Sequence, residues 1–467
     1  MTARCAIAFV LALVMSLAPA CSSSSTVEEP AAPTGSFSAA TSDESDSSSA
    51  ATPATTTTSS MAPTSTTDEP APTSVDFRTG AEVLADRRFD ILRGQRVGLI
   101  VNQTSLVDGR RLIDVVAEQD DIELVRLFAP EHGIDGSLAA GVSLADSIDD
   151  TTGVPIASLY GDTRQPTIEM FADLDVVVFD LQDVGSRSYT YISTMGLAMQ
   201  TAAATQTAFV VLDRPNPAGG ERIGGAILDP SLSSFIGMYP LPNVHGLTVG
   251  EIATLIVEQA WLDGLDGLDL TVVPMQGWTR DQMWSDLERD WVAPSPRLPT
   301  ADSALLYGGT VLLAGTSISD GSGTPTPFEL VGAPFIESGD ELAALLDARS
   351  LPGIRFEAVT FTPEAIPGVS PKPLHQGVEL DGVRLVVTDV HAVDPVRVAI
   401  EVLVAMQALA SPGSSIIIDP ASFDLVAGTT DLRQWIERGD TADDILTRLQ
   451  PALDDFERLR SSALLYD

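Results

Sequence analysis

Short apolar runs alternate with amphipathic stretches along the chain after residue 76. The apolar runs have the length and the Val, Ile and Leu content of buried strands, and the amphipathic stretches have the period of helices. Strands are predicted at residues 96–101, 122–128, 174–179, 208–212 and 270–273, and helices at 110–119, 195–205 and 248–260. This alternation predicts a mainly parallel sheet covered by helices on both faces.

The pattern changes after Pro294, where prolines separate shorter elements. Alternating residues suggest a strand pair that turns at Asp381-Gly382, followed by helices at 395–409 and 441–464, the second kinked at Pro451. We therefore predict an α/β protein. A Rossmann-like, mainly parallel sheet domain at 76–293 precedes a smaller α/β domain at 294–467.

Residues 1–20 have the pattern of an export signal, with a basic Arg4 and an apolar run too short to remain as a membrane span. They resemble a bacterial lipoprotein signal, in which Cys21 becomes the acylated first residue of the mature chain. An ordinary cleaved signal ending near Ala20 is the alternative. Both predict export, and the first predicts a lipid anchor at the outer face of the cell membrane or in the cell envelope.

Residues 21–75 consist mostly of Ser, Thr, Pro and Ala, so they cannot bury enough apolar surface to offset the entropy of ordering. A disordered tether is predicted, which holds the folded part away from the membrane. The only cysteines are Cys5 and Cys21. The folded part must therefore rely on a hydrophobic core rather than on disulfides.

The formal net charge is −39, which argues against a nucleic-acid partner because two polyanions repel each other. An anionic small group can still bind where arginines gather. Lys372 is the only lysine in the chain.

The first cluster of candidate site residues follows the strand predicted at 122–128. Glu131 and His132 lie there between Pro130 and Gly133. A carboxyl group at a strand end can be partly desolvated and donate a proton near neutrality, so Glu131 is a candidate general acid. The alternative is that Glu131 caps a turn.

The second cluster follows the strand predicted at 174–179. Its candidates are Asp180, Gln182, Asp183, Arg187, Tyr189 and Tyr191. Asp180 can point into the crevice beyond the strands, whereas Asp183 and Arg187 are close enough in sequence to pair. The two tyrosines can stack against a sugar ring or pack into the core.

Two further loops carry polar candidates. One follows the strand at 208–212 and presents Asp213, Arg214 and Asn216 on a proline-restrained loop. The other holds His245 before a helix whose capping box already uses Glu251. A lone loop histidine is more often a hydrogen-bonding residue than a catalyst.

Several chemistries are excluded by missing motifs. No Gly-rich dinucleotide fingerprint, Walker loop or nucleophile elbow is present, and the four histidines have no zinc-site spacing. We therefore expect no cofactor and no metal. A cofactor-free hydrolase or a binding protein remains.

Taken together, these motifs resemble the exo-β-N-acetylmuramidases of glycoside hydrolase family 171. The resemblance covers the chain after residue 75 and rests on Leu99–Thr104, Ala129–Gly133, Phe179–Gly185, Arg187, Tyr189–Tyr191, Leu212–Pro217, His245–Glu251, Pro294–Pro296 and the carboxyl end with Phe456, Arg460 and Tyr466. It adds Asn102 to the candidate substrate-binding residues.

The resemblance implies release of N-acetylmuramic acid from non-reducing ends of peptidoglycan fragments, in a cleft that the carboxyl-terminal domain closes. The partner is then a muramic-acid-terminated saccharide, whose lactyl carboxylate Arg187, Arg214 or Arg222 can receive. Glu131 would be the general acid, and Asp180 or Asp183 would assist by a retaining or an inverting route. Assistance by the 2-acetamido group of the substrate is the third route.

The chain also departs from the family pattern. An acid and an arginine that the family carries are replaced by Ala314 and Ser322, and Asp135 lies where an aromatic residue or an arginine is usual. These departures raise two alternatives, a catalytically inactive lipoprotein that binds peptidoglycan and an exo-hydrolase for another amino sugar.

Overall fold

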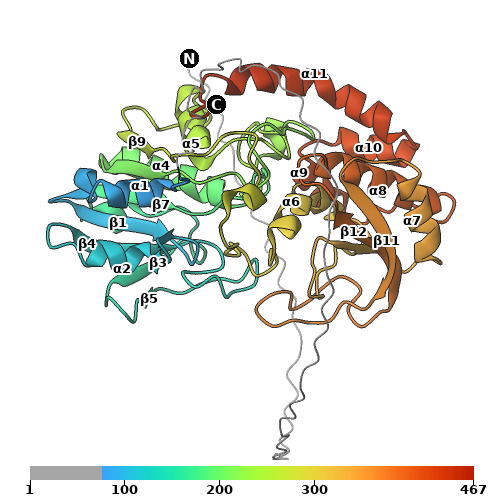
Figure 1. Cartoon of the computed structure of the whole chain (residues 1–467), viewed down its shortest axis with the longest axis horizontal. Helices are drawn as coiled ribbons and strands as arrows, with labels where there is room; N and C mark the ends of the chain where they lie inside the picture. Colours follow the sequence, from blue (N-terminus) through green and yellow to red (C-terminus); the bar gives the residue numbers. More distant parts are fainter. Residues whose placement is uncertain (1–75) are drawn as a thin grey trace, which may run out of the picture. The chain divides into compact units, whose positions relative to one another are not determined.

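The computed structural model describes residues 76–467, and its amino-terminal part is built on a seven-stranded sheet (Figure 1). The strand order is β5-β6-β4-β1-β7-β8-β9, and every neighbouring pair is parallel except β5 and β6. The strands are β1 (Arg96–Val101), β4 (Glu123–Ala129), β5 (Ser147–Ile148), β6 (Pro155–Ser158), β7 (Val176–Asp180), β8 (Ala208–Leu212) and β9 (Leu270–Val273). The predicted mainly parallel sheet is confirmed.

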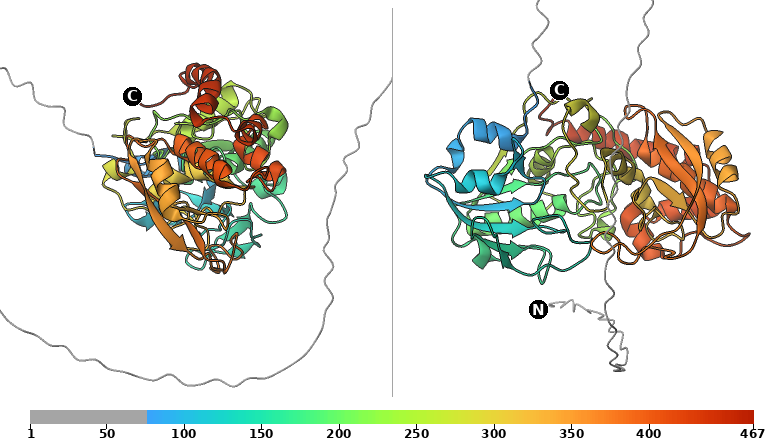
Figure 2. Two further views of the ribbon diagram at one scale, coloured as in Figure 1. Left: turned by 90° about the vertical axis from the view of Figure 1, so that its right-hand side faces the viewer. Right: turned by 60° about the horizontal axis from the view of Figure 1, so that its bottom comes forward.

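Helices cover both faces of this sheet because its strands are apolar on both sides (Figure 2). Val177 and Phe179 of β7 belong to the core that includes α4 and α5, whereas Val176 and Val178 belong to the core that includes α1 and α2. The helices of this part are α1 (Gly80–Asp86), α2 (Leu112–Ala117), α3 (Ile168–Phe171), α4 (Tyr191–Thr205) and α5 (Val249–Glu258), and a small hairpin joins β2 (Leu106–Val107) to β3 (Arg110–Arg111).

The order of the strands reverses between β1 and β7. The chain runs from β1 outward through β4 to β6, and then continues through β7, β8 and β9 on the other side of β1. Ligands of open α/β sheets bind beyond the carboxyl ends of the strands at such a reversal. Glu131 follows the end of β4 closely and Asp180 ends β7, so both leave the sheet at this edge.

The carboxyl-terminal part packs helices against a three-stranded antiparallel sheet of order β10-β12-β11. The strands are β10 (Leu330–Gly332), β11 (Ile354–Phe361) and β12 (Leu380–Val387), and the helices are α6 (Ala301–Thr310), α7 (Gly339–Asp347), α8 (Pro395–Leu409), α9 (Pro420–Ala427), α10 (Asp431–Arg438) and α11 (Ala442–Arg460). Single-turn 3-10 helices lie at Asp90–Leu92, Pro230–Leu232, Trp284–Leu287 and Val311–Leu313.

The predicted strand pair that turns at Asp381-Gly382 is wrong, because β12 runs straight through both residues. Gly382 pairs with Gly332 of β10 and with Val359 of β11. A Cβ atom at Gly382 would lie 2.1 Å from the carbonyl oxygen of Val331, so this glycine permits a close approach of two backbones.

Other boundaries differ less. β1, β8, β9 and α8 span the predicted residues. The helix predicted at 110–119 starts at Leu112, because Arg110 and Arg111 pair with β2 instead. Helix α4 starts earlier than predicted, at Tyr191, and α11 ends earlier, at Arg460.

The carboxyl terminus is fastened to the loops that follow β8. Arg460 Nη1 donates to the carbonyl oxygens of Gly220 at 2.9 Å and Gly246 at 2.8 Å. The Tyr466 hydroxyl donates to Asp213 Oδ2. These contacts hold α11 and the last residues on the amino-terminal part.

The signal peptide, Cys21 and the tether lie outside the described residues, so these interpretations stay predictions. In the stretch from 76 to 467, no helix is both long and apolar enough to cross a membrane.

The loops beside Glu131 run into β5, which is fixed by a buried acid. Asp149 follows β5 and accepts hydrogen bonds from Arg111 Nη1 at 2.8 Å and from Thr152 N at 2.9 Å. The Arg111 guanidinium and the Thr152 donors hold the pKa of Asp149 down at about 2. Because this pKa lies below its unfolded value, the interaction stabilises the fold at neutral pH and is lost as the pH falls from about 4 to about 2.

We therefore expect Asp149→Asn to lower the free energy of unfolding at pH 7 by roughly 1–2 kcal/mol. The variant should also lose less stability than the parent between about pH 4 and pH 2. Urea unfolding at a series of pH values measures both effects. Equal pH dependence of the two proteins would contradict this role of Asp149.

Candidate active site

Glu131 is a buried carboxylate that two donors hold in place. Its side chain is 7% exposed. Oε1 accepts from the backbone N–H of Gly141 at 2.9 Å, and Oε2 accepts from the Thr190 hydroxyl at 2.7 Å. Thr190 is the residue before α4 and Gly141 belongs to the loop after β4, so segments far apart in sequence orient one carboxyl group.

An inner cavity of about 80 Å³ opens beside this carboxylate. Glu131 is the one carboxylate among its lining residues in the described chain, which are Glu131, His132, Ala140, Ser188, Tyr189, Thr190, Ser295, Arg297, Leu298, Tyr307 and Phe328. The aromatic residues form a wall, since Tyr307 packs edge to face against both Tyr189 and Phe328. The cavity thus combines one acid with an apolar aromatic surface, as a sugar-binding hydrolase requires.

His132 lies next to the acid in a strained backbone conformation, with φ of +73°. Its Nδ1 is 2.7 Å from the carbonyl oxygen of Leu138, so Nδ1 carries the proton and Nε2 is left as an acceptor. Burial lowers the pKa of His132, and it outweighs the opposing effects of the Glu131 carboxylate and of the Leu138 carbonyl oxygen. The ring is therefore neutral near pH 7.

The two predicted tyrosines have different roles. Tyr189 lines the inner cavity, and its buried hydroxyl has no hydrogen-bond partner among the described residues. Tyr191 packs edge to face against Tyr189, accepts from Asn102 Nδ2 at 2.9 Å and donates to the carbonyl oxygen of Pro294 at 2.8 Å. Asn102 and Tyr191 therefore position the wall of the cavity and are not among the residues that line it.

A further tyrosine that the sequence did not indicate lies beside Glu131. Burial, together with the nearby Glu131 carboxylate, raises the pKa of Tyr160 to about 12. Its phenol therefore stays protonated at neutral pH and can serve as a hydrogen-bond donor near the acid.

Arg297 is the cation of the inner cavity, and sequence reasoning missed it. Its guanidinium lies over the Phe328 ring, with Cζ 4.7 Å from the ring centroid, and Nη2 donates to Asp320 Oδ2 at 2.7 Å. Nη2 also donates to the Ser322 hydroxyl. The available signal was its position directly after the Pro294–Pro296 motif.

An outer cavity of about 380 Å³ shares Arg297 with the inner one. Its lining residues are Arg297, Leu313, Ala314, Gly315, Thr316, Ile318, Asp320, Ser322, Ser370, Lys372, Pro373, Leu374, Ile418 and Asp419. Two of the departures from the family pattern, Ala314 and Ser322, therefore line this outer cavity and are not among the residues that line the inner one.

Asp180 and Arg214 form a buried ion pair and do not line the inner cavity. Arg214 Nε is 2.5 Å from Asp180 Oδ1, and the two side chains are 6% and 0% exposed. Burial raises the pKa of Asp180 while Arg214 opposes the rise. The structure thus does not bring Asp180 to Glu131, because its carboxylate is already used by Arg214.

Asp183 and His245 form a second buried pair. His245 Nε2 lies 3.6 Å from Asp183 Oδ2, too far for a hydrogen bond, and Asp183 Oδ2 accepts from the Gly185 N–H at 2.7 Å. Asp183 Oδ1 has no partner in the described chain. Burial raises the pKa of Tyr189 and of Tyr307, and the Asp183 carboxylate adds to the rise of both. Asp183 is not among the residues that line the inner cavity.

Arg187 is a buried residue whose guanidinium binds backbone carbonyl oxygens and so stabilises the fold. Nη1 donates to the carbonyl oxygens of Ala226 and Leu241, both at 2.7 Å, and Nη2 donates to that of Val426 at 2.8 Å. Burial lowers its pKa to about 9. The expected pairing of Arg187 with Asp183 is not formed, because backbone carbonyls take its donors.

The remaining candidates also join segments of the fold. Asp213 accepts from Gly250 N at 2.8 Å, Asn216 donates to the carbonyl oxygen of Leu247 at 3.1 Å, and Arg222 donates to that of Val390 at 3.0 Å. Asp213 and Asn216 are therefore scaffold residues rather than parts of the cavity wall.

Gln182 and Arg214 line a separate cavity of about 260 Å³, together with Phe77, Thr79, Glu82, Thr104, Leu106, Gly109, Trp284, Arg289, Asp290 and Val292. Gln182 Nε2 donates to the carbonyl oxygens of Asp183 and Pro215, both at 2.8 Å. Of the predicted site residues, the inner cavity brings together Glu131, His132 and Tyr189.

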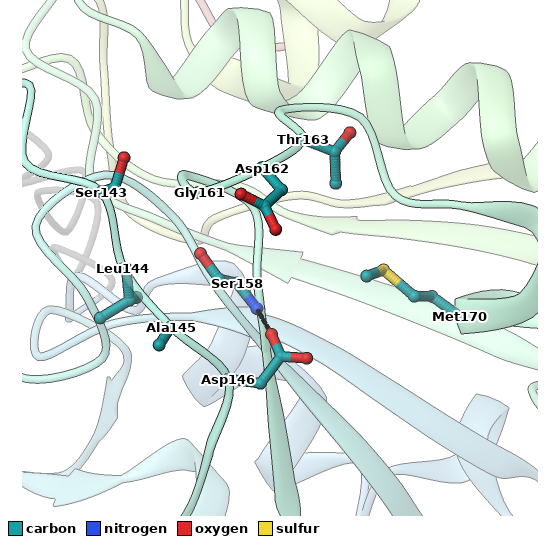
Figure 3. A pocket seen from close by; sticks show the side chains of 9 residues that line it. All are labelled: Ser143, Leu144, Ala145, Asp146, Ser158, Gly161, Asp162, Thr163 and Met170. Atoms are coloured by element: carbon teal, nitrogen blue, oxygen red, sulfur yellow. Dashed lines mark hydrogen bonds between the residues drawn. The ribbon is translucent and has the colours of Figure 1, made fainter.

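An open depression of about 450 Å³ is lined partly by the loop after β4, including Ser143 and Leu144 (Figure 3). Asp146 accepts from the backbone N–H of Ser158 at 2.9 Å there, and Met170 and Asp162 face the same space. None of the predicted site residues lines it. From residue 76 onward, no group of three or more His, Cys, Asp and Glu side chains is arranged to hold a metal ion.

Comparison with known proteins assigns both parts of the chain. Residues 97–302 match the family model of the amino-terminal domain of exo-beta-N-acetylmuramidase NamZ, and residues 305–466 match that of its carboxyl-terminal domain. Peptidoglycan beta-N-acetylmuramidase NamZ of Bacillus subtilis (strain 168) is 42% identical over 393 residues, which are 83% of this chain and 91% of that protein.

Two crystal structures share the fold. Both are DUF1343 family proteins from Bacteroides fragilis NCTC 9343, and each comparison covers 84% of this chain and 99% of the other. The TM-scores are 0.76 and 0.68, at 34% and 30% sequence identity. With both halves matched in order and the cavity placed around the Glu131 motif, the chain belongs to the exo-β-N-acetylmuramidase NamZ family.

Proposed function

We propose that the protein is an exo-acting glycoside hydrolase that releases N-acetylmuramic acid from the non-reducing ends of peptidoglycan fragments. The observation that carries this proposal is Glu131, a buried and doubly hydrogen-bonded carboxylate in an aromatic-walled cavity. Membership of the NamZ family supports the reaction and the substrate class.

Glu131 is placed to act as the general acid. A protonated carboxyl group gives its proton to the glycosidic oxygen as the bond from that oxygen to C1 breaks. The Thr190 hydroxyl that now donates to Oε2 can rotate and accept instead. The Gly141 N–H keeps Oε1 in position during this exchange.

The second role in the reaction is to stabilise the positive charge that develops at C1. Glu131 is the one carboxylate among the described residues that line the inner cavity, so no second carboxylate lies there to attack C1. We therefore propose that the 2-acetamido oxygen of the substrate attacks C1 and forms a bicyclic oxazolinium ion. Water then opens this ion with Glu131 as the base.

The inactive binding protein is the weaker candidate. Ala314 and Ser322 both line the outer cavity, and Asp135 lines neither the inner nor the outer one. The acid and its two donors remain in place, so these departures bear on substrate choice rather than on proton transfer.

We further propose that the protein is exported and held by a lipid on Cys21. The lipoprotein-like signal at residues 1–20 and the Ser- and Thr-rich segment at 21–75 support this location. A tethered active site can reach saccharide ends in the nearby cell wall.

Replacing Glu131 by Gln should reduce kcat/KM for a chromogenic β-N-acetylmuramide by roughly 10²–10⁴-fold, because the amide cannot donate the required proton. Release of the chromophore is the measurement. Glu123→Gln, an exposed residue at the start of β4, is the matched control and should keep full activity. A folded Glu131→Gln protein with normal turnover would contradict the acid role.

Attack by the acetamido group predicts that the released sugar keeps the β configuration of the substrate. Proton NMR of the anomeric region, recorded before the product equilibrates, should show the β anomer first. A thiazoline analogue of the oxazolinium ion should inhibit competitively. First appearance of the α anomer would exclude this route and indicate direct attack by water.

Replacing Cys21 by Ser should move the protein from the membrane fraction to the soluble fraction of the host bacterium, because the serine hydroxyl cannot form the thioether to a lipid. Immunoblots of the fractions measure this change, and metabolic labelling with a fatty acid reports acylation. Unlabelled parent protein would indicate an ordinary cleaved signal.

A further inference from the structure

The carboxyl ends of β1, β7 and β8 border a cavity that the proposed reaction does not use. Its volume is about 260 Å³, and we call it the β1–β7 cavity. Among its lining residues, Thr104 follows β1, Gln182 follows β7 and Arg214 follows β8. It therefore lies where the order of the strands reverses, which is where open α/β sheets bind ligands. It shares no lining residue with the inner cavity around Glu131.

The charged side chains of the β1–β7 cavity balance each other. Arg289 Nη1 donates to Glu82 Oε1 at 2.7 Å, and Arg214 is paired with Asp180. Asp290 is exposed, and within residues 76–467 its side chain takes part in no ion pair or hydrogen bond. The lining residues thus include two arginines, both already paired, and two carboxylates. The cavity consequently lacks the net positive charge that would attract an anion.

Single donors and acceptors remain unused at this cavity. Arg214 uses Nε and Nη2, and Arg289 uses Nη1 and Nη2, so one N–H group of each guanidinium is left over within the described chain. Gln182 Oε1 is buried and accepts no hydrogen bond from any described residue. The Asp290 carboxylate is a further acceptor. An uncharged ligand that both donates and accepts hydrogen bonds matches this set.

Two aromatic rings complete the lining. Trp284 Nε1 donates to the carbonyl oxygen of Arg289 at 3.1 Å, and its ring packs edge to face against Trp291, with the centroids 4.9 Å apart. The Arg289 guanidinium lies over the Phe77 ring, with Cζ 5.4 Å from the centroid. These contacts hold both rings in place. Fixed aromatic surfaces with a few polar groups between them suit the apolar faces and hydroxyl groups of a sugar ring.

A phosphate-bearing ligand fits this cavity poorly, although nucleotides bind at the same place in many doubly wound sheets. The start of α1 is capped by its own side chains, because Thr79 N donates to Glu82 Oε2 at 3.0 Å and Glu82 N donates to Thr79 Oγ1 at 3.3 Å. The Glu82 carboxylate would repel a phosphate there. No glycine-rich phosphate loop follows β1 in the sequence.

We propose that the β1–β7 cavity is a second, non-catalytic saccharide site that binds one uncharged N-acetylated amino sugar, the N-acetylglucosamine of a peptidoglycan strand. Pockets for drug-sized ligands span about 300–1,000 Å³, so a volume of about 260 Å³ suits a single sugar ring. Val292 lines this cavity and Ser295 lines the inner one, so a short segment separates the two. A strand bound here would raise the local concentration of saccharide ends beside Glu131. The choice of sugar rests on the proposed muramidase function, whereas binding does not require catalysis.

Fluorine NMR of protein labelled with fluorinated tryptophan tests this site, because Trp284 lines it. The chain has five tryptophans, and the signal that disappears in Trp284→Phe identifies residue 284. Titration with N,N′-diacetylchitobiose should shift this signal saturably. The signal of Trp435, in α10, should stay in place and shows that the fold is kept. Adenosine monophosphate should leave the Trp284 signal unchanged.

Three variants assign the binding to this cavity. Asp290→Ala should weaken chitobiose binding by roughly 10-fold, because a charged acceptor is lost. Asp266→Ala, which changes another exposed aspartate in the loop before β9, is the matched control and should bind like the parent. Val292→Phe should abolish the shift of Trp284, because the larger side chain fills the cavity.

The outcomes separate the two proposals. An unchanged Trp284 signal, or equal affinity of the Asp290→Ala and Asp266→Ala proteins, would overturn the saccharide site and leave the muramidase function standing. A shift with adenosine monophosphate alone would also overturn it and indicate a nucleotide site. A parent protein that binds chitobiose here and cleaves no chromogenic muramide would refute the proposed hydrolase and keep the saccharide site.

Discussion

The site depends on one constraint, that the buried Glu131 carboxylate must find hydrogen-bond donors. An unpaired acid in such a place would be neutralised or would destabilise the fold. The Thr190 hydroxyl and the Gly141 N–H satisfy it, and they join the start of α4 to the loop after β4. These two hydrogen bonds offset the cost of burying the carboxylate, and they also orient it toward the inner cavity.

Buried arginines then hold the surrounding loops. Arg187 links two loops to the end of α9 through carbonyl oxygens, and Arg460 links the end of α11 to the loops after β8. Arginine suits this role because its planar group offers five donors in a fixed geometry. Arg187, which the sequence analysis proposed as a substrate-binding residue, therefore stabilises the fold instead. From the sequence alone, a motif rich in Arg, Asp and Asn that binds a ligand cannot be distinguished from one that binds backbone groups of the same protein.

The parallel sheet could be predicted because its strands are apolar on both faces. Such strands appear in the sequence as short continuous apolar runs, as at Ala208–Leu212. The carboxyl-terminal sheet was harder. At Gly382 the sequence shows only a dipeptide that is typical of turns. The glycine is needed instead for the close approach of β10, a tertiary contact that the local sequence does not indicate. Glu131 and His132 could be found because they follow a clear strand. Arg297 was missed although it directly follows the Pro294–Pro296 motif, because its stacking on Phe328, a residue distant in sequence, is visible only in the structure.

The acidity of the protein bears directly on how it can recognise an acidic sugar. A net charge of −39 repels a carboxylate at long range, but this repulsion is screened over about 8 Å at physiological ionic strength. Within that distance, the charged and polar groups nearest to the substrate determine whether its carboxylate is attracted or repelled. Almost all arginines of the described chain are engaged by carboxylates or carbonyl oxygens, and such pairs have little attraction left for an anion. Arg297 of the inner cavity is such a pair too, because its Nη2 donates to Asp320 Oδ2 at 2.7 Å, so little of its attraction is left for the carboxylate of a substrate.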